Sequence, residues 1–98
     1  MEEVVFEEFP ETWKPVTVGD EIEGTVEEFK TVDVHGEARR LVLIATDDGV
    51  RTVWLNGVLS GKFRAGRVVE GDRIKIVYEG KKESPVSRYM YNDYRVFK

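Results

Sequence analysis

The stretch Val18-Gly19-Asp20-Glu21-Ile22-Glu23-Gly24-Thr25-Val26 begins with a Gly-Asp turn and continues as a run of alternating apolar and charged residues. The same design returns fifty-two residues later, in Glu70-Gly71-Asp72-Arg73-Ile74-Lys75-Ile76-Val77-Tyr78. Strict alternation is typical of a strand with one face in a core and the other in water. The two stretches therefore predict two half-buried strands, over residues 21–30 and 73–79.

Three further runs have strand character. Residues 39–46 are nearly all apolar after Arg40, the hairpin turn Asp47-Asp48-Gly49 follows, and residues 50–55 continue the pattern. A last run covers residues 88–97, whereas the glycine-rich residues 56–66 fit a single helical turn or a structured loop. Five short strands with a connector after the third predict a mainly all-β fold, a five-stranded OB-fold-like Greek-key barrel.

The alternation also assigns faces. In the first strand the apolar phase slips by one residue between Val26 and Phe29, which predicts a β-bulge, and Gly24 predicts a bend where the strand coils. In the third strand we expect Val53 and Leu55 to face inward and Trp54 outward. The residues expected inside the fourth and fifth strands are Ile74, Ile76, Tyr78, Met90, Tyr94 and Val96.

Length and composition limit the function classes. The chain has 98 residues, which predicts one domain, over residues 13–98, preceded by an acidic arm over residues 1–12. It has no cysteine and a single histidine, His35, so we expect neither a metal site nor a cofactor. No apolar run approaches the roughly 20 residues that span a bilayer. Met1 is followed by two glutamates rather than a leader, so we expect a cytoplasmic protein.

The amide content is low. There is no glutamine and only two asparagines, while charged residues make up 35% of the chain, a pattern typical of thermostable proteins. The same pattern is also compatible with a designed or reconstructed sequence.

The charge is unevenly distributed. Residues 1–38 hold twelve acidic and two basic residues, and residues 39–98 hold seven acidic and thirteen basic residues. Such a split is typical of a basic binding surface beside an acidic tail, although accidental segregation on a solvated surface gives the same counts. We hypothesise that the acidic arm occupies the basic surface when no ligand is bound.

The candidate site combines aromatic and basic side chains. Aromatic rings stack on unpaired bases, and Arg and Lys neutralise phosphates. In an OB-fold the binding face lies on the second and third strands and the loops 31–37 and 80–87. The predicted nucleic-acid-binding residues are Trp54, Arg39, Arg51, Lys62, Phe63, Arg64, Lys81, Lys82, Tyr89 and Tyr91.

Several of these residues have a second interpretation. Phe63 suits the core better than the surface, because a connector helix usually plugs one end of a barrel. Trp54 also fits burial under a loop or under the N-terminal arm, and Lys81 and Lys82 fit a solvated loop. Trp13 is expected to be structural.

Catalysis has little support, and we expect a protein that is not an enzyme. Asp47 and Asp48 are adjacent carboxylates, but the glycine that follows them indicates a hairpin turn rather than a catalytic pair. Asp33 and His35 lie close in sequence, but no nucleophile pattern surrounds them.

Four strings carry a family resemblance: Thr12-Trp13-Lys14-Pro15, Gly19-Asp20-x-Ile22-x-Gly24-x-Val26, Gly71-Asp72-x-Ile74-x-Ile76-x-Tyr78-x-Gly80-Lys81-Lys82 and Tyr91-x-Asp93-Tyr94-x-Val96. With them the chain resembles small single-domain OB-fold single-stranded DNA-binding proteins of phage and microbial type. The resemblance implies sequence-tolerant binding of single strands in DNA replication or recombination. It also implies that Lys81, Lys82 and Tyr91 lie near the nucleic acid.

The expected partner is therefore single-stranded DNA, with RNA left open, together with replication or recombination proteins. Two alternatives remain: a protein-interaction or assembly OB module that binds no nucleic acid, and a stable scaffold with little binding activity. The salt dependence of binding distinguishes the protein-interaction module from a nucleic-acid-binding protein. Binding at an apolar protein interface responds weakly to salt, whereas phosphate binding weakens strongly as salt is added.

Overall fold

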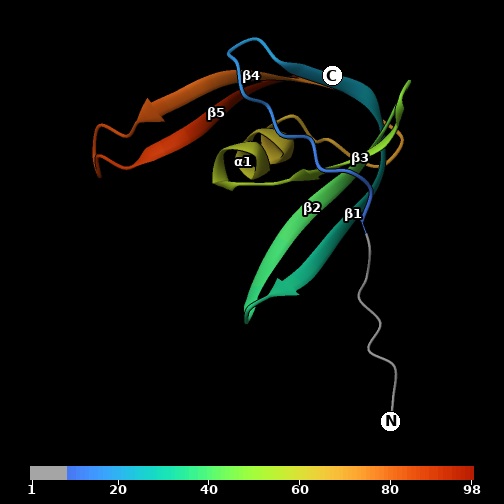
Figure 1. Cartoon of the computed structure of the whole chain (residues 1–98), viewed down its shortest axis with the longest axis horizontal. Coiled ribbons are helices and arrows are strands. Elements are labelled where there is room, and N and C mark those ends of the chain that lie inside the picture. The colour runs from blue at the N-terminus through green and yellow to red at the C-terminus, as the bar shows by residue number, and fades with distance from the viewer. Residues whose placement is uncertain (1–8) are drawn as a thin grey trace.

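The computed structural model describes residues 9–98, so most of the predicted acidic arm, residues 1–8, lies outside the described residues. Five strands and one helix make up the fold (Figure 1). In chain order they are β1 (Glu21–Val34), β2 (Glu37–Thr46), β3 (Gly49–Trp54), α1 (Gly57–Ala65), β4 (Arg73–Glu83) and β5 (Met90–Phe97).

The strands form one antiparallel sheet in the order β3-β2-β1-β4-β5. The sheet curves strongly, and the β1–β2 and β4–β5 hairpins extend as two arms in different directions with α1 between their bases (Figure 1). The predicted mainly β, five-stranded OB-fold-like architecture, with a short helix after the third strand, is confirmed.

The two matching Gly-Asp turns lie at opposite ends of one antiparallel strand pair. Gly19 and Gly71 adopt φ angles of 97° and 92°, a left-handed conformation that glycine adopts at little cost. The Asp20 carboxylate accepts hydrogen bonds from the N–H groups of Val16 and Thr17, and Asp72 accepts one from Val69. The strands that leave these turns pair antiparallel, with Ile22 opposite Ile76, which joins the two halves of the sheet.

The predicted irregularity of β1 is confirmed. The β1–β2 register shifts between Val26 and Glu28, and Phe29 returns to the core side. At Gly24 the neighbouring strand approaches so closely that an added Cβ would lie 2.1 Å from the carbonyl oxygen of Ala45. Glycine is therefore required here by the close approach of two backbones.

The core lies between the concave side of the sheet and α1. Asn56 caps the helix by accepting a hydrogen bond from the Leu59 N–H, and Leu59 and Phe63 point into the core. Of the residues expected inside the fourth and fifth strands, Val96 is partly buried against the core and Met90 lies outside it, while the others are buried. The buried cluster is Ile22, Val26, Val42, Ile44, Val53, Leu59, Phe63, Val68, Ile74, Ile76, Tyr78 and Tyr94. Met90 is 61% exposed, because the β4–β5 arm extends past the end of the core.

Four elements are longer than predicted. β1 continues to Val34, β2 begins at Glu37 and β4 continues to Glu83, so strand covers most of the expected loop 31–37 and the first half of the expected loop 80–87. The helix α1 has nine residues rather than a single turn. The arms are held by cross-strand hydrogen bonds beyond the core, where no burial imposes an alternating pattern on the sequence.

The N-terminal segment, residues 9–13, bridges the two edge strands. Trp13 donates its N–H to the Thr52 carbonyl of β3, and its ring lies 6.1 Å from the ring of Tyr94 in β5. Thr52 also donates its N–H to Glu11 and its hydroxyl to the Pro10 carbonyl. Since β3 and β5 do not pair with each other, this segment fills the place where a closed barrel would join them.

Candidate nucleic-acid interface

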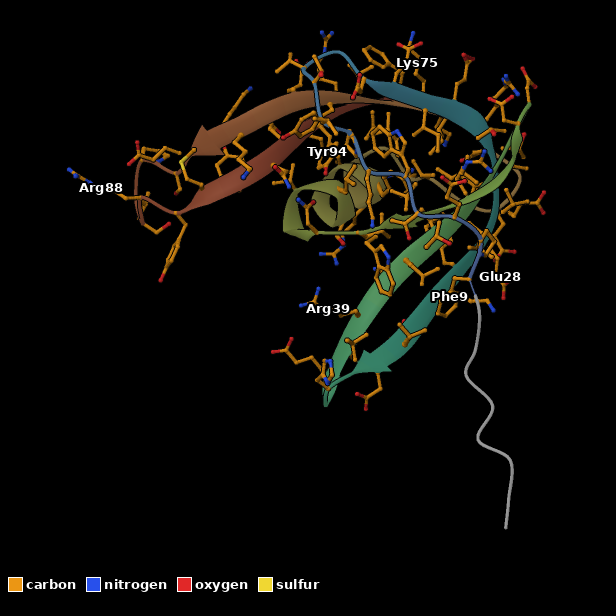
Figure 2. The ribbon with its side chains drawn as sticks, viewed as in Figure 1. Phe9, Glu28, Arg39, Lys75, Arg88 and Tyr94 are labelled. Carbon is orange, nitrogen blue, oxygen red and sulfur yellow. The ribbon has the colours of Figure 1, made fainter. Side chains whose placement is uncertain are left out.

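A groove of about 560 Å³ lies between the two arms. β2 contributes its first residues, the end of β3 contributes Trp54, α1 contributes Ser60, and β5 contributes Asn92 and Tyr94. Figure 2 shows Arg39 projecting from β2 into the space between the arms, while Arg88 points away from the tip of the other arm. The remaining lining residues are Glu37, Ala38, Arg40, Leu55 and Asn56.

Trp54 lies at the junction of this groove with the outer face of β2 and β3. It pairs across the strands with Leu41, which is fully buried although it faces away from the core. The Phe9 ring meets the Trp54 ring edge-on, with centroids 6.3 Å apart, and also lies against the Lys30 ammonium. Leu41 pairs with Lys30 on one side and with Trp54 on the other. Because Phe9 contacts both of these neighbours, it lies over Leu41 between them.

The N-terminal segment therefore partly covers Trp54, in agreement with one of its two sequence interpretations, while its role in stacking stays a prediction. The N-terminal segment packs against one edge of the indole ring, and the ring still lines the open groove. A partly covered indole in a groove is held in one orientation, which lowers the entropy lost when a flat ligand stacks on it.

Arg39 and Arg40 reach the groove from opposite faces of β2. Arg40 lies opposite Thr31 and continues the core-facing row of Val42, whereas Arg39 continues the outer row of Leu41. Arg39 forms an ion pair with Glu37 at 3.7 Å, and both side chains are well exposed. Such an exposed ion pair contributes little to the stability of the fold.

The floor of the groove is polar and held by hydrogen bonds. Asn56 donates from its side-chain amide to the Asn92 carbonyl at 3.2 Å, which ties the start of α1 to β5. The Tyr78 hydroxyl donates to the Asn92 side-chain oxygen at 3.1 Å. Sequence reasoning missed both asparagines, although they are the only two in a chain with no glutamine, which was an available signal.

Lys62 and Lys82 are already partnered. The Asp93 carboxylate lies 2.8 Å from the Lys82 ammonium and 3.6 Å from the Lys62 ammonium, and Lys62 also donates to the Tyr94 carbonyl. The Lys82 contact lowers the pKa of Asp93 and raises the pKa of Lys82. Two of the predicted phosphate ligands thus share one carboxylate at the side of the groove.

The other predicted site residues are dispersed. Arg51 lies at the opposite end of β3, beside Trp13, Asp47 and Asp48. Phe63 is 5% exposed and belongs to the core, as its second interpretation had it, and Arg64 lines a neighbouring pocket. Lys81 and Tyr91 lie on the β4–β5 arm and Tyr89 lies 76% exposed in the turn before β5.

The described part of the chain has two further properties that bear on function. None of its helices has the length and apolar character needed to span a bilayer. Residues 9–98 also contain no group of three or more His, Asp or Glu side chains arranged to hold a metal ion.

Comparison with known proteins gave no match: neither the protein-family models, nor the curated proteins, nor the solved structures contain a significant relative of this chain.

Proposed function

We propose that this protein binds single-stranded nucleic acid, with single-stranded DNA as its partner, by base stacking and phosphate contacts. The observation that carries the proposal is the groove between the arms, where the Trp54 ring lies among Arg39, Arg40 and a hydrogen-bonding floor. An aromatic ring stacks on any base, and guanidinium groups donate hydrogen bonds to any phosphate. The binding is accordingly sequence-tolerant and non-enzymatic.

Tryptophan fluorescence tests this proposal. Titration with oligo-dT at low salt should quench the emission of Trp54, and added salt should reverse the quenching, with log K falling by about 0.7 per neutralised phosphate for each unit of log salt. Trp54→Ala should weaken binding by about 5- to 150-fold, the equivalent of 1–3 kcal/mol for one stacked base.

The control is Phe97→Ala, which removes an exposed aromatic ring of β5 that does not line the groove. Its affinity for oligo-dT should equal that of the wild type. Absence of quenching at micromolar DNA, or equal weakening by Phe97→Ala and Trp54→Ala, would refute the proposed function.

One observation favours a second function, a protein-interaction module. The chain's own N-terminal segment already docks on the outer face of the sheet, with main-chain hydrogen bonds to Thr52 and an aromatic anchor, Phe9, beside Trp54. Peptides add to sheet edges in this manner. An interaction of this type would be insensitive to salt, whereas nucleic-acid binding falls steeply as salt is added.

A further inference from the structure

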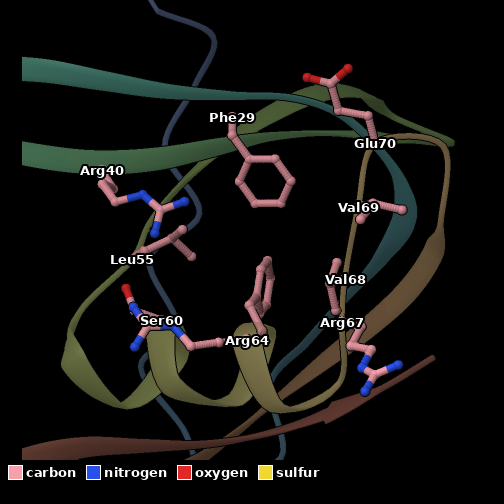
Figure 3. A pocket seen from close by; sticks show the side chains of 10 residues that line it. Phe29, Arg40, Leu55, Ser60, Arg64, Arg67, Val68, Val69 and Glu70 are labelled. Carbon is pink, nitrogen blue, oxygen red and sulfur yellow. The ribbon is translucent and has the colours of Figure 1, made fainter.

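A second pocket lies beside the groove, between α1 and the base of the β1–β2 arm (Figure 3). Its volume is about 600 Å³, within the range of pockets that hold small organic ligands. Figure 3 shows Phe29 pointing into it from β1, with Leu55 on one side and Val68 and Val69 on the other. The Phe29 and Phe63 rings meet at right angles here, with centroids 6.2 Å apart, so the base of the pocket is apolar and aromatic.

The rim of this pocket is basic. Arg40, Arg64 and Arg67 line it together with one carboxylate, Glu70. Within residues 9–98 none of the three guanidinium groups forms an ion pair, whereas Lys62, Lys82, Arg73, Lys75, Arg95 and Lys98 all do. Three arginines without ion pairs, against a single carboxylate, leave the rim of this apolar pocket positively charged, which favours a ligand that joins a flat apolar group to an anion.

The pocket and the groove adjoin each other. Arg40, Leu55 and Ser60 line both of them, so a ligand of more than one unit can extend from Trp54 past Arg40 toward Arg67. A single strand of nucleic acid has the required repeat, because each nucleotide carries one planar base and one phosphate.

We propose that this pocket binds one unstacked base of the bound single strand, held against Phe29, while Arg40, Arg64 and Arg67 bind the flanking phosphates. The inference rests on the proposed function and adds to it a second base site. This second site lies on the core-facing side of β2, where Arg40 lies. The bound strand then crosses the start of β2, with one base at Trp54 and another at Phe29.

Methyl NMR of the full chain tests the inference separately from the proposed function. Val68 and Val69 line the pocket and not the groove, so their methyl signals report a base ring beside Phe29. A thymidine hexanucleotide at saturation should shift both signals, whereas a thymidine dinucleotide should quench Trp54 and shift them less. A free thymidine monophosphate at the same concentration distinguishes a nucleotide pocket from a site that fills only as part of a strand.

Charge reversal provides the second measurement. Arg64→Glu and Arg67→Glu should each weaken hexanucleotide binding about tenfold and leave the dinucleotide affinity within about twofold. Lys14→Glu is the matched control, since Lys14 is exposed and lines neither the pocket nor the groove. It should leave both affinities close to those of the wild type.

The outcomes separate the two claims. Quenching of Trp54 without movement of the Val68 and Val69 signals overturns the second base site and leaves the proposed function standing. Equal losses in Arg64→Glu, Arg67→Glu and Lys14→Glu also overturn it, because net charge alone then governs affinity. If neither Trp54 nor the valine signals respond, the proposed function itself fails.

Discussion

At the scale of single residues, three aspartate carboxylates hold turns and lysine side chains in place. Asp20 and Asp72 hold the two matching turns through backbone N–H groups, and Asp93 holds two lysines beside the groove. Each of these contacts requires the ionised carboxylate. The stability of the fold therefore depends on the charge of particular aspartates rather than on the acidic composition as a whole.

Acid sensitivity follows from the turn aspartates. Hydrogen bonds from the Thr17 and Val16 N–H groups lower the pKa of Asp20, and the Val69 N–H, with a smaller contribution from Lys98, lowers the pKa of Asp72. A carboxylate whose pKa is lowered by folding stabilises the fold above its unfolded pKa of about 3.9 and loses that effect as the pH falls through its folded pKa.

The variant Asp20→Asn/Asp72→Asn should therefore be less stable than the wild type at neutral pH and should lose less stability between about pH 5 and pH 2. Thermal melts across this range measure both quantities. An equal fall in melting temperature with pH for variant and wild type would contradict the role of these two aspartates in acid sensitivity.

Asp93 limits the positive charge beside the groove. Asp93→Asn should release the Lys62 and Lys82 ammonium groups and raise single-strand affinity by about three- to tenfold at low salt, with the gain shrinking as salt is added. The control is Glu79→Gln, which removes the carboxylate that pairs with Arg95 on the same arm. Equal gains in both variants would show that only net charge matters.

At the scale of elements, strand length is set by pairing and strand shape by glycine. The arms of β1 and β4 continue beyond the core because their partners β2 and β5 extend with them. The sharp coiling of β1 depends on Gly24, where the β2 backbone passes too close for any side chain. The position of Phe29, and hence of the second pocket, follows from the bulge next to it.

Two glycine substitutions separate these effects. Gly24→Ala should destabilise the fold by about 1–3 kcal/mol or more, since the added Cβ would overlap the Ala45 carbonyl. Gly61→Ala, in the middle of α1 where an added Cβ meets no atom within 4 Å, should stabilise it by about 0.5–1 kcal/mol. Denaturant unfolding measures both, and a neutral Gly24→Ala would refute the close-approach argument.

At the scale of the whole molecule, the N-terminal segment stabilises the fold, and the acidic-arm hypothesis gives it a second role, competition with the ligand. Residues 10–13 satisfy the hydrogen-bonding groups of the fully buried Thr52, so removing them would leave buried polar groups without partners. Phe9 lies beside Trp54 at the edge of the groove, and Glu2, Glu3, Glu7 and Glu8 precede it in the chain. The two roles divide between residues 10–13 and the acidic residues before Phe9.

Deleting residues 1–8 should therefore raise single-strand affinity by about three- to thirtyfold at low salt, because the hypothesis assigns the competition to these four carboxylates, while the contacts of Thr52 remain. The full-length variant in which these four glutamates become glutamine should reproduce the gain. Fluorescence titration measures both, and unchanged affinity in either variant would refute competition by the acidic arm.

The sequence by itself determined the strands, the turns and most of the core. Alternating residues such as Ile74, Ile76 and Tyr78, the Gly-Asp turns and the phase slip before Phe29 are local signals, and each is confirmed. The five-stranded OB-fold-like architecture follows from their order along the chain.

Only the tertiary structure decided which side chains meet. Arg40 and Arg67 are far apart in sequence, and they share a pocket because the sheet curves around α1. Lys62 and Lys82, both predicted phosphate ligands, pair with the same carboxylate, Asp93, which no local pattern indicates. Periodicity reports which way a side chain points from its own strand, whereas its neighbours depend on sheet order and curvature, which are set by distant contacts.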